Sequence, residues 1–141
     1  MTSQLRNALI GLAASVLAVS SGPAMATGDS AASKAVWDGH LQKVMSGDLD
    51  AVMTDFTDES TILTPDKIYI GAGEIRGYIG KFIAGLTPEA KKTLTMQTET
   101  PCGDIVFTKF TVGAAKRTFV YTAEVKSGKI VTITTANYPS E

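Results

Sequence analysis

The sequence has one cysteine, Cys102, and one histidine, His40. A single cysteine cannot form a disulfide within the chain, so the stability of the fold must come from packing. We expect Cys102 to be a buried small apolar residue, with an intermolecular bridge or a reactive thiol as the alternatives. A zinc or iron site needs several converging ligands, and a lone histidine does not supply them. No metal site is therefore predicted.

The sequence also lacks a dominant charge, since its net charge is −1 and the two signs are interspersed. Nucleic-acid binding requires basic residues gathered on one face, so we expect no nucleic-acid partner. The glycines of Gly71-Ala72-Gly73 are similar to a phosphate-binding loop, but Arg76 stands where a dinucleotide-binding motif requires glycine. We interpret them as a turn into a helix, and no cofactor is predicted.

No apolar run in the sequence is long enough to form a stable membrane span. The run from Ala8 to Val19 follows Arg6 and precedes Ala24-Met25-Ala26. This is the pattern of a cleaved secretory signal. We expect residues 1–26 to be removed after Ala26 and the protein to be periplasmic or secreted. Residues 27–33 are then a flexible lead-in to one domain over residues 34–141.

The first half of that domain has helical periodicity. Between Ser33 and Ser46 the apolar residues and His40 fall on one half of the helical wheel, so the histidine faces inward. Gly47 is expected to end this helix, and Asp48 to cap a short second one. A third helix is predicted over residues 71–85.

The second half has the alternating pattern of β-strands. Two short strands are expected at 61–64 and 67–70, and four longer ones at 94–100, 105–112, 117–126 and 129–137. The order indicates an α+β fold with three N-terminal helices packed on a curved, mostly antiparallel sheet. Because the last two strands are apolar on both faces, we expect a homodimer through the outer face. A solvated, threonine-rich face is the alternative.

Several local patterns resemble the NTF2-like superfamily and its SnoaL-like domains. They are Trp37-x-x-His40, Gly47-Asp48-Leu49-Asp50-Ala51-Val52, Asp55-Phe56-Thr57-Asp58-Glu59-Ser60, Leu63-Thr64-Pro65-Asp66, Gly71-x-x-x-Ile75-Arg76 and Lys126-Ser127-Gly128-Lys129-Ile130-Val131. The resemblance runs from about Ser33 to Asn137 and implies the NTF2-like (cystatin-like) cone, with a conical pocket and a homodimeric assembly. The superfamily includes ketosteroid isomerase, limonene epoxide hydrolase, scytalone dehydratase and polyketide cyclases, so the fold alone does not decide the reaction.

The isomerase pattern makes clear demands on the residues. It implies an aspartate base before a proline, where this chain has Thr64, and a hydroxyl is too weak a base for that reaction. The resemblance places His40 at the first proton-donor position and Tyr121 near the second. Asp66 and Glu74 are nearby acids that could orient His40, but we interpret both as surface residues. The Asp-Arg-Asp set of the epoxide hydrolase cannot be placed on inward positions.

Three functions remain open at the level of sequence. The first is binding of a small, largely apolar molecule in the cone, by Trp37, His40, Thr64, Tyr121 and Asn137. The second is an enzyme of the isomerase, dehydratase or hydrolase type, with His40 as general acid or base and Tyr121 as its catalytic partner. The third is a homodimeric association module without a ligand.

Overall fold

The structure is a computed structural model that describes residues 28–113 and 116–139. The predicted signal segment and its cleavage after Ala26 lie outside the described residues, and so does the side chain of Cys102. Within the described ranges, no helix combines the length and the apolar character that a membrane span requires.

The helices of the described chain are α1 (Ser30–Ser46), α2 (Leu49–Met53), α3 (Gly71–Gly85) and α4 (Pro88–Thr93). α1 begins earlier than predicted because the Asp29 carboxylate accepts hydrogen bonds from the backbone N–H groups that open the helix. The expected lead-in over 27–33 is therefore shorter. Gly47 ends α1 with φ 84°, and Asp48 caps α2, both as predicted.

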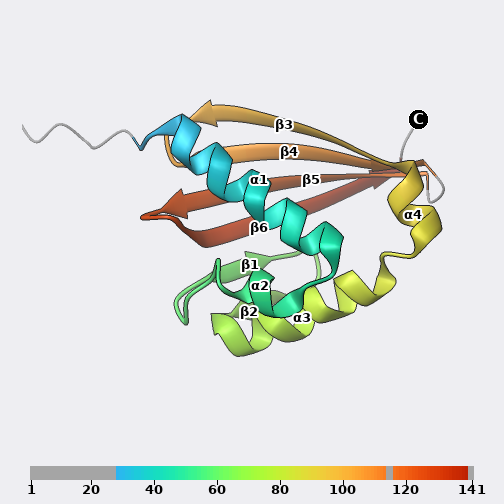
Figure 1. Cartoon of the computed structure of the whole chain (residues 1–141), viewed down its shortest axis with the longest axis horizontal. Coiled ribbons are helices and arrows are strands. Elements are labelled where there is room, and N and C mark those ends of the chain that lie inside the picture. Colours follow the sequence, from blue (N-terminus) through green and yellow to red (C-terminus); the bar gives the residue numbers. More distant parts are fainter. Residues whose placement is uncertain (1–27, 114–115, 140–141) are drawn as a thin grey trace, which may run out of the picture.

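The short helix α4 was not predicted, because Pro88 was interpreted only as the end of the preceding helix. Proline is equally suited to the first position of a new helix, where no backbone N–H is needed. Thr87 caps this helix by accepting a hydrogen bond of 3.1 Å from the backbone N–H of Ala90. The described residues therefore contain one helix more than expected, lying between α3 and the long strands (Figure 1).

In the part of the chain that the structure describes, six strands form one sheet in the order β2-β1-β6-β5-β4-β3 (Figure 1). Their bounds are β1 Thr61–Leu63, β2 Ile68–Ile70, β3 Leu94–Cys102, β4 Ile105–Val112, β5 Arg117–Lys126 and β6 Lys129–Pro139. β1 runs parallel to β6, and every other neighbouring pair is antiparallel. The predicted α+β architecture with a mostly antiparallel sheet is confirmed.

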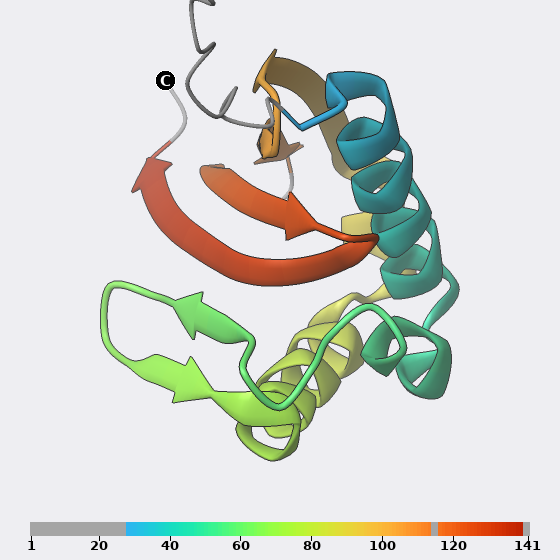
Figure 2. The ribbon, with the colours of Figure 1, turned by 90° about the vertical axis from the view of Figure 1, so that its left-hand side faces the viewer.

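The hairpin between β5 and β6 turns at Ser127 and Gly128, as predicted. Both residues have positive φ, 51° and 73°, which is the backbone geometry of the two-residue turn that matches strand twist. β5 and β6 leave this turn strongly bent, with α1 and α3 beside them (Figure 2). The bend gives the sheet an inner side that the helices cover.

The inward side chains divide β4 and β5 into a packed half and an open half. Val106 on β4 and Ala123 on β5 are fully buried in the core. Further along the same faces, Phe110 on β4 and Phe119 on β5 line a cavity instead. The two pairs belong to one antiparallel ladder, in which Val106 lies opposite Ala123 and Phe110 opposite Phe119. The layer is therefore closed at one end and hollow at the other.

Candidate functional site

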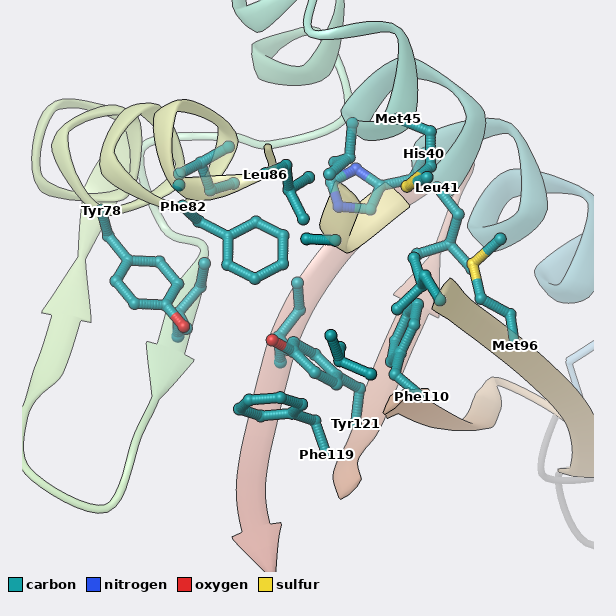
Figure 3. Close-up of a pocket in the computed structure, with 18 of the residues that line it drawn as sticks. His40, Leu41, Met45, Tyr78, Phe82, Leu86, Met96, Phe110, Phe119 and Tyr121 are labelled. Atoms are coloured by element: carbon teal, nitrogen blue, oxygen red, sulfur yellow. The ribbon is translucent and has the colours of Figure 1, made fainter. Parts of the chain in front are cut away.

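A cavity of about 340 Å³ lies between α1, α3, α4 and the inner face of the sheet (Figure 3). Its wall is mostly aliphatic and aromatic, with Leu41, Leu86 and Phe110 among the lining side chains. Phe82 and Met96 line the cavity and are also 40% and 46% exposed, so they mark its mouth. The volume is within the range of small-molecule pockets. The predicted hollow inside the cone is present.

Trp37 and His40 form the part of the wall that α1 contributes. The Trp37 indole donates a 2.6 Å hydrogen bond from Nε1 to Oγ1 of Thr108, which is fully buried on β4. The indole and imidazole rings stack, with centroids 5.2 Å apart and planes inclined by 20°. The edge-on ring of Phe56, 5.3 Å away, contacts the imidazole as well. Packing thus fixes the orientation of the His40 ring.

The partner of His40 is Asp55, which the sequence did not predict. The Nδ1 atom of His40 lies 3.0 Å from Oδ2 of Asp55, and both residues are buried. Asp66 and Glu74, which the sequence places near His40, are both exposed surface residues, as interpreted from the sequence. The Glu74 carboxylate instead accepts a hydrogen bond from the backbone N–H of Ile70 at the start of α3. The turn after α2 instead brings Asp55 under α1.

The backbone of Asp55 is tied to the sheet. Its N–H bonds to the carbonyl of Val52 at the end of α2, and its carbonyl accepts a 2.9 Å hydrogen bond from the N–H of Ile130 on β6. The Ser60 hydroxyl donates to the Ile130 carbonyl at 2.7 Å, which holds the same loop from its other end. The loop therefore presents the Asp55 side chain to α1 in a fixed position.

The second oxygen of the Asp55 carboxylate accepts a hydrogen bond from the Lys43 ammonium, one turn after His40 on α1. Burial alone would raise the pKa of Asp55, but the hydrogen bonds from His40 and Lys43 and the charges of those partners outweigh it. The pKa of Asp55 is consequently lowered from its ordinary value. Asp55 is thus ionised at neutral pH, and Lys43 compensates its charge.

The ionised carboxylate determines which nitrogen of His40 carries the proton. A carboxylate can only accept hydrogen bonds, so Nδ1 must donate its proton to Asp55. In the neutral ring Nε2 then has a free lone pair. Figure 3 shows the imidazole at the cavity wall with this edge of the ring turned inward. In the described part of the chain, no side chain or backbone group hydrogen-bonds to Nε2.

Tyr121 lines the cavity from β5, as predicted, and faces Tyr78 on α3. The two phenol oxygens point toward each other in Figure 3. Burial raises the pKa of Tyr121 far above its ordinary value, and the neighbouring Tyr78 raises it further. Burial raises the pKa of Tyr78 as well. Both phenols therefore keep their protons and act as hydrogen-bond donors.

Two of the predicted ligand-binding residues do not reach the cavity. Thr64 belongs to the β1–β2 turn, where its hydroxyl donates a 2.8 Å hydrogen bond to the Lys67 carbonyl and accepts one of 3.0 Å from the Lys67 N–H. Asn137 lies opposite Phe119 near the end of β6 but is exposed. The local turn and the end of the strand take these side chains away from the cavity, whereas Trp37, His40 and Tyr121 line it.

Sequence reasoning missed Asp55 and the role of Tyr78. Tyr78 follows the inward stripe of α3, and its aromatic surface fitted core and cavity equally well. Asp55 had no periodic signal, because it lies in the loop after α2. Over residues 28–113 and 116–139, no cluster of His, Cys, Asp or Glu could hold a metal ion.

The sequence matches no protein-family model, and no curated protein is significantly similar to it. Solved structures do resemble the fold. A SnoaL-like protein of unknown function from Burkholderia thailandensis aligns with a TM-score of 0.61 and 13% identity, over 79% of this chain and 98% of that one. An NTF2-like protein of unknown function from Cytophaga hutchinsonii aligns with a TM-score of 0.56 and 9% identity, over 76% and 90% of the two chains.

A third structure is that of a candidate polyketide cyclase from Sinorhizobium meliloti. It aligns with a TM-score of 0.56 and 17% identity, over 72% of this chain and 94% of that one. The structural similarity establishes the fold, and sequence identities this low leave the reaction open. The predicted NTF2-like cone is confirmed as the fold of this chain.

The Asp55→Asn variant tests the buried hydrogen-bond network. We expect it to lower the free energy of unfolding at pH 7 by about 2 kcal/mol, because it removes a buried charge that both His40 and Lys43 contact. A depressed carboxyl pKa stabilises the fold above the ordinary value of 3.8 and ceases to do so as the pH falls through the folded-state value. The difference between wild type and variant should therefore shrink below pH 3.8.

Urea unfolding followed by the fluorescence of Trp37, the single tryptophan, measures this difference. The matched control is Asp50→Asn, which removes an exposed ion pair with Arg76 and should cost less than about 0.5 kcal/mol. A variant at position 55 as stable as wild type at pH 7 would contradict the network.

Proposed function

Because the chain has the NTF2-like fold around an apolar cavity, we propose that it binds a small, largely apolar molecule there, with His40 as a polar anchor. The observation that carries this proposal is the free Nε2 of His40 in a mostly apolar wall. A buried acceptor without a partner is costly, and a ligand hydroxyl or amide N–H would satisfy it. An open cavity of this size also favours binding over the function of a ligand-free association module.

A pair of probes of nearly equal size tests the anchor. 2-Naphthol carries a hydroxyl where 2-methylnaphthalene carries a methyl group, and only the hydroxyl can donate to Nε2. We expect His40→Ala to lower the ratio of the two affinities, naphthol to methylnaphthalene, by about fivefold to tenfold. Isothermal titration calorimetry at pH 7.5 measures both affinities.

Leu41→Ala is the matched control, because it also removes a wall side chain of α1 but no polar atom. It should weaken both probes and leave their ratio unchanged. If neither probe binds the wild-type protein, the binding proposal fails. If both bind and the ratio is unchanged in His40→Ala, His40 is not the anchor.

A second function, proton transfer, is favoured by the contact between Asp55 and His40. A base is effective when one ring nitrogen is held by a carboxylate and the other faces the substrate, which is the arrangement of Asp55 and His40. In such a reaction Nε2 would remove a proton from a bound molecule, and Asp55 would stabilise the resulting imidazolium. Thr64, which occupies the position of the isomerase base, lies outside the cavity wall. Of Thr64 and His40, therefore, His40 is the candidate base.

Hydrogen exchange on a bound ketone tests this second function. In deuterium oxide, the wild-type protein should catalyse the replacement of the methyl protons of 2-acetylnaphthalene by deuterium, which proton NMR follows. His40→Ala should lower the rate by about 100-fold or to the buffer rate. Equal exchange with wild type and with His40→Ala would exclude His40 as the base.

We extend the proposal to an exported protein that pairs through the outer face of its sheet. Support for pairing comes from outward apolar residues: Ile68 and Ile70 on the edge strand β2 are 54% and 63% exposed, and Leu63 of β1 lies beside Ile68.

N-terminal sequencing of protein from the exported fraction should begin at Thr27, and sedimentation of that protein should give twice the chain mass. An intact N-terminus would contradict cleavage after Ala26, and a monomer would contradict pairing through the sheet.

A further inference from the structure

Three hydroxyl groups from three different elements converge at the side of the cavity that α3 and the sheet share. Tyr78 comes from α3 and Tyr121 from β5, and their oxygens face each other (Figure 3). Thr135 of β6 lies directly opposite Tyr121 in the strand pairing and interacts with the Tyr78 hydroxyl. His40 supplies a polar group to the cavity from α1, on a different wall. The cavity therefore has two separate polar groups on an apolar surface.

We propose that the paired hydroxyls of Tyr78 and Tyr121 bind a carbonyl or hydroxyl oxygen of the ligand, while His40 accepts a hydrogen bond from another ligand group. The ligand class that fits is a neutral, mainly apolar molecule with an acceptor oxygen and, apart from it, a donor group. This inference rests on the proposed binding function and adds a second polar contact to it.

The protonation of the two phenols agrees with a donor role. Burial raises the pKa of Tyr121 and of Tyr78, so both hydroxyls are protonated at neutral pH. When one phenol donates to the other, the pair still has one hydroxyl proton to donate. A ligand oxygen can accept that proton in place of the Thr135 hydroxyl, whereas an apolar ligand group cannot.

The charges around the cavity favour a neutral ligand. Among the described residues that line the wall, Lys81 alone has a permanent charge, and it is exposed. A carboxylate bound beside the tyrosines would lose its water without gaining a buried cation, which is costly. An anionic group would therefore have to remain at the exposed edge, near Lys81.

The two tyrosine rings are held by neighbours that do not use the hydroxyl groups. Phe110 meets Tyr121 edge-on at 5.0 Å, and Tyr69 packs on Tyr78 at 4.6 Å. A change of either tyrosine to phenylalanine keeps these ring contacts and removes only the oxygen. Such variants isolate the polar contribution.

The test uses the ketone 2-acetylnaphthalene and the alkene 2-isopropenylnaphthalene, which have nearly the same shape but differ in the acceptor oxygen. We expect Tyr121→Phe and Tyr78→Phe each to lower the ratio of ketone affinity to alkene affinity by about fivefold to tenfold, as measured by calorimetry. The matched control is Tyr138→Phe, which removes the same atom from an exposed residue outside the cavity wall. It should leave the ratio unchanged.

The outcomes separate this inference from the proposed function. If the wild-type protein binds neither the ketone nor the alkene, the cavity does not bind apolar molecules and both proposals fail. If both bind and the ratio does not change in either phenylalanine variant, the binding function stands and the tyrosine site is overturned. Tighter binding of 2-naphthoate than of the ketone would overturn the neutral ligand class.

Discussion

The hydrogen bond between His40 and Asp55 is the interaction on which the chemistry of the cavity depends. The ionised carboxylate can only accept, so it holds the proton on Nδ1 and leaves the lone pair of Nε2 on the cavity side. Lys43 supplies the compensating charge, and the Ile130 N–H fixes the backbone of Asp55. Contacts in the packed end of the domain thereby determine which nitrogen of His40 is protonated at the cavity wall.

The same division explains how a small domain keeps a cavity without losing its core. On β4 and β5, Val106 and Ala123 pack at one end, while Phe110 and Phe119 line the cavity at the other. α1 spans both parts, since Trp37 is fixed to β4 by Thr108 and still contributes to the cavity wall. The polar groups of the cavity are thus carried by elements that the core makes rigid, which favours a precisely oriented ligand.

The sequence predicts the parts of this structure that depend on local pattern. The helical stripe places His40 inward, Gly47 ends α1, and strand alternation gives the four long strands. It does not predict Asp55, because a loop residue has no periodic signal and its position depends on a backbone contact with β6. The prediction that Thr64 lines the cavity is wrong for a related reason. Its hydroxyl donates a hydrogen bond to the Lys67 carbonyl in the turn, and the resemblance in sequence does not show this contact.

The tautomer of His40 tests the central claim most directly. Long-range proton–nitrogen NMR correlation on the protein at pH 7.5 distinguishes a protonated ring nitrogen from one with a free lone pair. We expect a protonated Nδ1 and a bare Nε2 in the wild-type protein, with the Nε2 resonance shifting when 2-naphthol is added. A proton on Nε2, or an Nε2 resonance that does not respond to the probe, would contradict the proposed site.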